Sequence, residues 1–185
     1  MTFKKDFFQE YFDVLHSKLV SINRCDLIAV ANLIYDTHIA GGKIIIAGNG
    51  GSAAMASHVS VDLVKAAGIR AINFNEADLI TCFANDFGYE LWIQKAIESY
   101  ADSSDLVILI SSSGNSKNII NAAKYSRDNH LNLITLSGFS SANMLRNFGV
   151  INLWVDSLSY NVVELTHQAW LLSVVDYIIN VNKIE

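Results

Sequence analysis

The stretch from residue 43 to residue 63 holds the residue types that most plainly indicate chemistry. It begins with a short run rich in isoleucine, which is typical of a strand buried on both faces. Gly50 and Gly51 then allow a sharp turn and a close approach of the backbone to a ligand, and Ser52 stands where the N-cap of a following helix is expected. A helix N-terminus presents free N–H groups to an anion. The pattern predicts a phosphate-binding turn; its alternative is a tight strand–helix connection that binds nothing.

The helix that follows this turn carries two ionisable residues, His58 and Asp62. Their spacing of four places both side chains on one helix face. An imidazole and a carboxylate so arranged can act as acid–base groups or as two ligands of a divalent metal. A solvent-exposed pair without a function gives the same spacing, and the spacing alone leaves both interpretations open.

A second turn of the same kind follows the most apolar strand of the sequence, residues 106–110. The turn is rich in hydroxyl groups, which phosphate oxygens accept as hydrogen-bond donors; its serines are Ser111, Ser112, Ser113 and Ser116. A helix is expected from residue 117 to about 129. The serine run therefore predicts a second wall of the anion site.

The elements that must position these turns alternate between strand and helix. Amphipathic helices are predicted over residues 3–22 and 26–39, ahead of the first strand. The remaining predicted elements are strands at 68–74, 131–136 and 150–155, helices at 77–84, 90–100, 141–147 and 160–181, and a turn at 85–90. This alternation predicts an α/β fold with a mainly parallel sheet covered on both faces. Ligands of such folds bind beyond the carboxyl ends of the strands, where both turns must lie.

Length and composition narrow the class of protein. The 185 residues fit one domain, half of them are hydrophobic, and the net charge is −5. The absence of a basic block argues against nucleic acid as a partner. No uninterrupted apolar run approaches the ~20 residues of a membrane span, so no membrane association is expected. Charged residues near the start do not fit a signal peptide, and two cysteines are too few for a disulfide framework, so a cytoplasmic location is expected.

The motifs together resemble the sugar isomerase (SIS) domain family, and within it the phosphoheptose isomerases. The resemblance rests on the glycine turn 48–52, on His58, on the segment 84–88 and on the serine turn 110–116, and it covers nearly the whole chain. It implies one SIS domain over residues 1–185, with a three-layer α/β/α fold, a five-stranded and mainly parallel sheet, and two N-terminal helices. It also implies a homotetramer with sites at subunit interfaces, which fits the apolar surplus.

The same resemblance implies a set of substrate-binding residues. The sugar phosphate would be held by the first-turn serine and by the serine turn. The sugar pocket would be lined by three further polar residues. The implied residues are Asn49, Gly50, Gly51, Ser52, Asn85, Asp86, Ser111, Ser112, Ser113 and Ser116.

The acid–base and metal positions depart from the family pattern. The first histidine is matched by His58, but the glutamate position falls on Asp62, one methylene shorter. On the last helix, Glu164 stands at the family's glutamine and Leu172 at its catalytic histidine. His167 matches a neighbouring histidine that is not the usual acid–base group. The resemblance thus implies one divalent metal, zinc in the first place, held by His58, Asp62 and Glu164.

These departures leave three functions open. The first is an aldose–ketose isomerase that converts sedoheptulose 7-phosphate to a heptose 7-phosphate for surface polysaccharide. The second is an isomerase of another phosphosugar. The third is a non-catalytic SIS protein, either one that binds a phosphosugar without turning it over or one that acts through interaction with another protein. For an isomerase, Asp62 or Glu164 would act as base and His58 or His167 as acid. A core or interface histidine with no catalytic role is the alternative for His167.

Overall fold

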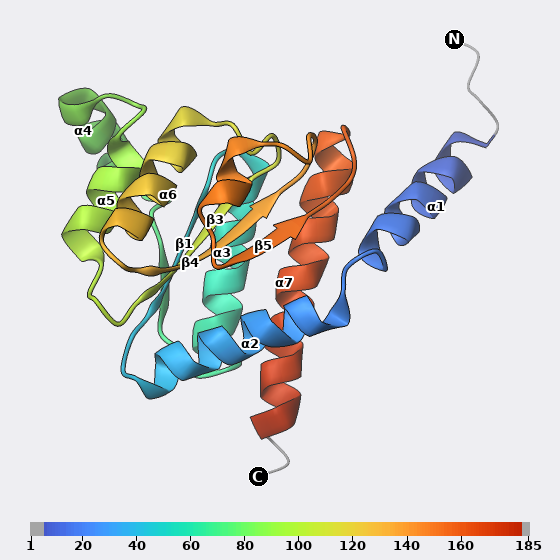
Figure 1. The fold of residues 1–185 in the computed structure, drawn as a ribbon, viewed down its shortest axis with the longest axis horizontal. Helices are drawn as coiled ribbons and strands as arrows, with labels where there is room; N and C mark the ends of the chain where they lie inside the picture. Colours follow the sequence, from blue (N-terminus) through green and yellow to red (C-terminus); the bar gives the residue numbers. More distant parts are fainter. Residues whose placement is uncertain (1–5, 183–185) are drawn as a thin grey trace.

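A computed structural model describes residues 6–182, which form a five-stranded sheet between two layers of helices (Figure 1). The strand order is β2-β1-β3-β4-β5 and every neighbouring pair is parallel. The strands are β1 (Ile44–Gly48), β2 (Ala71–Asn73), β3 (Leu106–Ser111), β4 (Asn132–Ser137) and β5 (Ile151–Trp154). All residues of β1 and β3 are buried, as their apolar composition predicts. The α/β class and the parallel five-stranded sheet are confirmed.

The helices cover the sheet in two groups, each with its own hydrophobic core. One core lies between the sheet and α2, α3 and α7, and the other lies under α5 and α6. The helices are α1 (Phe7–Leu19), α2 (Arg24–Ile39), α3 (Gly51–Lys65), α4 (Ala77–Phe87), α5 (Trp92–Tyr100), α6 (Lys117–Asp128) and α7 (Tyr160–Asn182), with a 3₁₀ turn, η1 (Met144–Asn147).

Three local predictions are wrong. The helix predicted at 141–147 is only the 3₁₀ turn η1, Met144–Asn147. Ser52 is not the N-cap of α3, because the helix begins at Gly51 and Gly50 occupies the cap with φ +55°, a conformation that glycine adopts without strain. Residues 85–87 are the last turn of α4 rather than a loop, and the helix ends at Gly88 with φ +83°. The signal for a turn came from Asn, Asp and Gly together, and only the glycine ends the helix.

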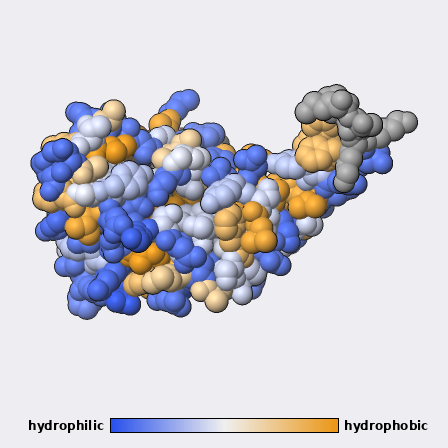
Figure 2. Space-filling view, turned by 90° about the horizontal axis from the view of Figure 1, so that it is seen from above, coloured by the Kyte–Doolittle hydropathy of each residue, from blue (hydrophilic) through white to orange (hydrophobic). Residues whose placement is uncertain are grey.

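Helix α1 projects from the body of the molecule as an arm (Figure 1). None of its residues is buried, and Phe7, Phe8 and Phe12 are each more than half exposed. Figure 2 shows apolar surface along this arm. Its C-terminal end is fastened to α7, where the indole N–H of Trp170 donates to the carbonyl of Leu19 at 2.9 Å. Residues 3–5 of the predicted helix lie outside the described residues.

The amino end of the sheet is closed by an ion cluster. The Lys43 ammonium lies 2.6 Å from the Asp105 carboxylate and 2.8 Å from that of Asp102. Asp105 is 1% exposed and also accepts the backbone N–H groups of Lys43 and Asp102. Burial lowers the pKa of Lys43, but the hydrogen bonds to the two carboxylates raise it more, and the net shift is upward. This cluster fixes the start of β1 against the loop that enters β3.

By length and composition alone, residues 160–181 of α7 would suffice to cross a membrane. Half of the residues in its most apolar 18-residue stretch are buried inside the fold, where α7 packs on the sheet beside α2 and α3. Its apolar character follows from this position, because a helix that contacts neighbours on several sides has few positions open to water.

Candidate functional site

The two predicted turns lie side by side at the carboxyl ends of β1 and β3. The strands are neighbours in register, and their last pair is Gly48 with Ile110. A pocket of about 300 Å³ opens between the turns. Its lining residues are Asn49, Gly50, Gly51, Ser52, Ile110, Ser111, Ser112, Ser113, Ser116, Tyr160 and Glu164. We call it the serine pocket.

The serine pocket is rich in small donors. Ser52, Ser111 and Ser112 are each buried, at 3–5% exposure. The Ser111 hydroxyl donates to that of Ser116 at 3.2 Å, whereas the Ser112 hydroxyl finds no partner among the described residues. A buried hydroxyl without a hydrogen bond costs about 1–3 kcal/mol. A ligand with acceptor oxygens would remove that cost.

Glu164 is the one charged residue among those lining the serine pocket. It rises from α7 and covers the first residue of α3: a Cβ on Gly51 would collide with its carboxylate. Gly51 is therefore required for the approach of Glu164, in addition to the turn itself. Burial raises the pKa of this carboxyl. Neither lysine nor arginine lines the pocket, so an anion bound there would depend on neutral hydroxyls and backbone N–H groups.

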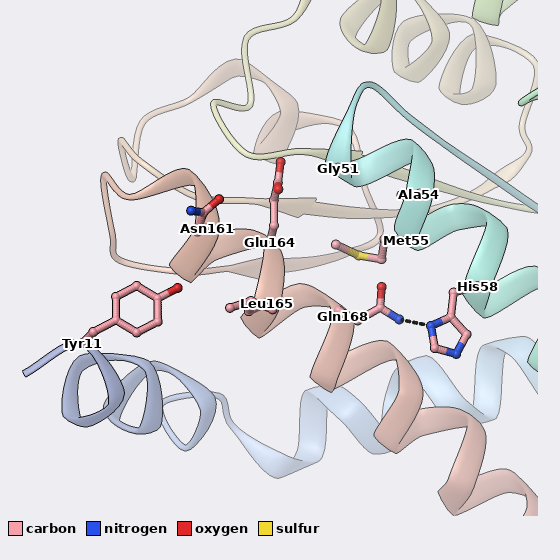
Figure 3. Close-up of a pocket in the computed structure, with 9 residues that line it drawn as sticks. All are labelled: Tyr11, Gly51, Ala54, Met55, His58, Asn161, Glu164, Leu165 and Gln168. Carbon is pink, nitrogen blue, oxygen red and sulfur yellow. Dashed lines mark hydrogen bonds between the residues drawn. The ribbon is translucent and has the colours of Figure 1, made fainter. Parts of the chain in front are cut away.

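A second pocket of about 440 Å³ lies between α3 and α7, and Glu164 lines both. Its lining residues are Tyr11, Gly51, Ala54, Met55, His58, Asn161, Glu164, Leu165 and Gln168 (Figure 3). We call it the histidine pocket. Tyr11 reaches it from the α1 arm.

His58 is held on two sides in the histidine pocket. The Gln168 amide nitrogen lies 3.2 Å from Nδ1 of His58 (Figure 3), and Nε2 lies 3.4 Å from a carboxylate oxygen of Asp62. An amide N–H donating to Nδ1 leaves the proton on Nε2, where it faces Asp62. The sequence reasoning missed Gln168. Its spacing of four from Glu164 was the available signal, because it puts both on one face of α7.

The predicted metal ligands do not come together. Among residues 6–182, no group of three or more His, Cys, Asp or Glu side chains is placed to hold a metal ion. His58 and Asp62 are close, but Glu164 lies over Gly51, about two turns earlier on α3 than His58. The partner of His58 on α7 is Gln168, one turn beyond Glu164. The donor set of this chain therefore does not fit the predicted three-ligand site.

His167 and Leu172 both lie outside the two pockets. His167 is fully buried and lines neither pocket; its Nε2 lies 3.0 Å from the carbonyl oxygen of Ser137. Burial lowers the pKa of His167 to about 4, against a partial increase from that hydrogen bond. The structure thus places His167 in the core, outside both pockets, and its acid–base role stays a prediction. Leu172 packs against the core that α7 shares with the sheet.

The polar residues predicted to line a sugar pocket are divided. Asn49 lines the serine pocket, where its side chain exchanges two hydrogen bonds with Asn118, a residue that sequence reasoning missed. Asn85 and Asp86 are exposed on α4, where the Asn85 amide donates to Asp86 at 2.9 Å. They line neither pocket of this chain.

Known proteins share both the sequence and the fold. The phosphoheptose isomerase of Chlorobium limicola is 36% identical over 124 residues, which cover 63% of this chain and 58% of that relative. The solved phosphoheptose isomerase from Francisella tularensis superposes with a TM-score of 0.87 at 24% identity, covering 97% of this chain and 99% of that one. For that of Neisseria gonorrhoeae the TM-score is 0.83 at 24% identity, with 93% and 95% covered.

The family match includes the turns of the serine pocket but not the helix α7, which lines the histidine pocket. The chain spans about three fifths of the length of the curated relative. Residues 7–138 match the SIS domain, a span that contains both turns of the serine pocket and stops before α7. The match covers well over half of the sequence, and the chain belongs to the SIS domain family.

Proposed function

We propose that this protein is a phosphosugar aldose–ketose isomerase that holds the phosphate in the serine pocket. The observation that carries the proposal is the buried, unpartnered hydroxyl of Ser112, in a pocket formed by two strand–helix turns. Backbone N–H groups and hydroxyls are the donors that anion sites at helix N-termini use. Because Glu164 lines both pockets, the sugar carbons of a ligand anchored there would extend past it into the histidine pocket.

The reaction needs a base beside the carbon next to the carbonyl and an acid beside the oxygens. In our proposal Glu164 takes the proton from that carbon, which gives an enediol intermediate. Glu164 then returns the proton to the neighbouring carbon, the former carbonyl carbon. Burial raises the pKa of the Glu164 carboxyl, so it holds a proton more readily than a free carboxylate does, which favours a role in proton transfer. His58 moves the hydroxyl proton between the two oxygens through Nε2, which turns from Asp62 to the substrate oxygens while Gln168 still contacts Nδ1. Asp62 is the alternative base.

The substrate we favour is sedoheptulose 7-phosphate, converted to a heptose 7-phosphate for surface polysaccharide, because the relatives are phosphoheptose isomerases. A different phosphosugar is the second candidate. It is favoured by Glu164 and Leu172, which replace the glutamine and the catalytic histidine of the family pattern. A protein that binds a phosphosugar without turnover is the third, and Leu172 is again the reason, since leucine moves no proton.

We also propose a divalent metal, with zinc as the first candidate. Its support is the resemblance to the phosphoheptose isomerases. Of the three predicted ligands only His58 and Asp62 lie close together, and no step above depends on a metal. Thermal melts with zinc and with a chelator test this point. A bound metal at a hundredfold excess over its dissociation constant would stabilise the fold by about 2.7 kcal/mol.

We further propose that the chain acts in the cytoplasm as a homotetramer. The support is the α1 arm, whose exposed aromatic side chains have no cover within the described chain. Large apolar surfaces of this kind mark subunit interfaces. Light scattering at micromolar concentration would give four times the chain mass, and a monomer would contradict the assembly.

The experiment for the activity is turnover of a panel of ketose and aldose phosphates, followed by NMR in D₂O with and without zinc. Deuterium incorporated at the carbon next to the carbonyl reports proton abstraction directly. We expect exchange and product with sedoheptulose 7-phosphate. Turnover of another sugar only would select the second candidate. Binding of phosphosugars without any exchange would select the third.

A further inference from the structure

A reciprocal amide pair joins the two turns of the serine pocket. The Asn49 side-chain N–H₂ donates to Oδ1 of Asn118 at 3.0 Å, and the Asn118 side-chain N–H₂ donates to Oδ1 of Asn49 at 2.9 Å. Asn49 belongs to the glycine turn after β1, and Asn118 is the second residue of α6, directly after the serine turn. Asn118 is 3% exposed and does not line the pocket.

Each of the two amide oxygens accepts one further hydrogen bond, and these bonds fix the orientation of both amides. Oδ1 of Asn118 also accepts the backbone N–H of Ile119 at 3.0 Å, which fixes it to the first turn of α6. Oδ1 of Asn49 also accepts the hydroxyl of Tyr89 at 3.2 Å. Both oxygens therefore have two donors, which is the number that an amide oxygen can accept. Rotation of either amide would bring like groups together and break these bonds.

The pair lies where the sheet no longer connects the two turns. The ladder between β1 and β3 ends at Gly48 and Ile110, so the residues that would touch a phosphate lie beyond the last backbone bond between the strands. A single anion can accept from both turns only if their spacing matches its size. Donors that are already in place when the ligand arrives bind it more tightly, because no ordering cost remains to be met.

We propose that Asn118 is a positioning residue of the serine pocket, which acts through Asn49 to hold the glycine turn at a fixed distance from the serine turn. This proposal rests on the phosphate binding proposed above. Asn118 itself touches no ligand. Its loss weakens phosphate binding although every donor to the phosphate remains.

The test uses inorganic phosphate as the probe, in calorimetric titrations of the full chain. Asn118→Ala removes both bonds of the pair, and we expect its phosphate affinity to fall at least about fivefold, the equivalent of one net hydrogen bond of about 1 kcal/mol. Asn118→Asp keeps the acceptor and loses the donor, so it should also bind more weakly. The double variant Asn49→Ala with Asn118→Ala should bind no more weakly than the weaker single variant, because one residue acts through the other.

Two control variants separate positioning from loss of stability. Asn121→Ala lies one turn further along α6 and removes only an exposed bond to the carbonyl of Glu90. Ser126→Ala removes a fully buried hydroxyl of the same helix that donates to Ala122. We expect both to bind phosphate as the wild type does, even if Ser126→Ala melts earlier.

The outcomes are distinguishable. If the wild type binds phosphate and folded Asn118→Ala binds it equally well, the positioning role is wrong and the proposed function stands. Additive losses in the double variant would also overturn the role, since they would show two independent contributions. If the wild type itself binds no phosphate, the proposed function fails, and this inference fails with it.

Discussion

The two ends of the parallel sheet differ in how their polar groups are satisfied. At the amino end, the buried carboxylate of Asp105 accepts from the Lys43 ammonium and from two backbone N–H groups. At the carboxyl end, the buried Ser112 hydroxyl has no partner among the described residues. Glu164 faces the same pocket without a cation in its lining. The buried polar groups of the ion cluster at the amino end all have partners, whereas, among residues 6–182, the carboxyl end has a buried hydroxyl and a carboxylate without one.

This difference assigns separate roles to the two ends. Buried polar groups in folded proteins are almost always hydrogen-bonded, and exceptions call for an explanation. The ion cluster at the amino end contributes to stability, because its buried carboxylate already has its hydrogen-bond partners. In our proposal, the carboxyl end gives up some stability and keeps its hydrogen-bond donors for a ligand. Substitutions at the amino end should therefore change stability with little effect on binding, and substitutions at the carboxyl end should do the reverse.

The largest effect is expected at the amino end. Asp105→Ala leaves the Lys43 ammonium and two backbone N–H groups without their acceptor, and we expect a loss of about 3–5 kcal/mol in the free energy of unfolding, as for other broken buried ion pairs. Urea denaturation measures it. Asp102→Ala is the matched control, because that side chain is 80% exposed, and its loss should be far smaller. Equal losses in the two variants would contradict the buried role of Asp105.

The next effect lies beneath the carboxyl end, at His167. Burial lowers its pKa from the ordinary 6.5 to about 4, so between these values the unfolded chain binds the proton and the folded one does not. Stability from this group is complete above pH 6.5 and falls as the pH drops to 4, by about 3 kcal/mol in total. Urea denaturation at pH 7 and pH 4.5 should show a clearly weaker pH dependence for His167→Gln. An unchanged dependence would exclude His167 as its source.

The smallest effect tests the charge of the serine pocket. Glu164→Gln removes the negative charge without changing the size of the side chain. Two unit charges ~4 Å apart in water repel by about 1 kcal/mol, so phosphate should bind up to about fivefold more tightly at pH 7. Turnover should fall at the same time, because the proposed base is lost. Calorimetry with phosphate and the D₂O exchange assay separate the two. Unchanged phosphate affinity would show that Glu164 does not face the anion, and weaker binding would contradict its repulsive role.

The serine pocket could be predicted from the sequence because each half of it is local. A buried strand, a turn of small residues and a helix are contiguous at 44–52 and again at 106–117. Parallel neighbours then bring both turns to the same edge of the sheet. Only the cap of α3 was misplaced, because Gly50 takes the cap position with φ +55° and the helix already begins at Gly51, one residue before Ser52.

The histidine pocket could not be predicted in the same way, because its contacts depend on packing. His58 and Gln168 lie 110 residues apart, and which turn of α7 faces α3 is decided by how the two helices pack on the sheet. If α7 were shifted by one turn along its axis relative to α3, Glu164 rather than Gln168 would lie beside His58. Asn118 and Asp105 were missed for the same reason, since their partners Asn49 and Lys43 are 69 and 62 residues away.

The most direct test of the central claim is calorimetric titration of sedoheptulose 7-phosphate into the wild type and into the double variant Ser111→Ala with Ser116→Ala. The account predicts saturable binding by the wild type. It also predicts at least about a tenfold loss in the variant, because hydrogen bonds to charged groups contribute about 1.5–3 kcal/mol each, while the urea midpoint changes little. Equal affinity of the two proteins for the sugar phosphate would contradict the account and place the phosphate elsewhere.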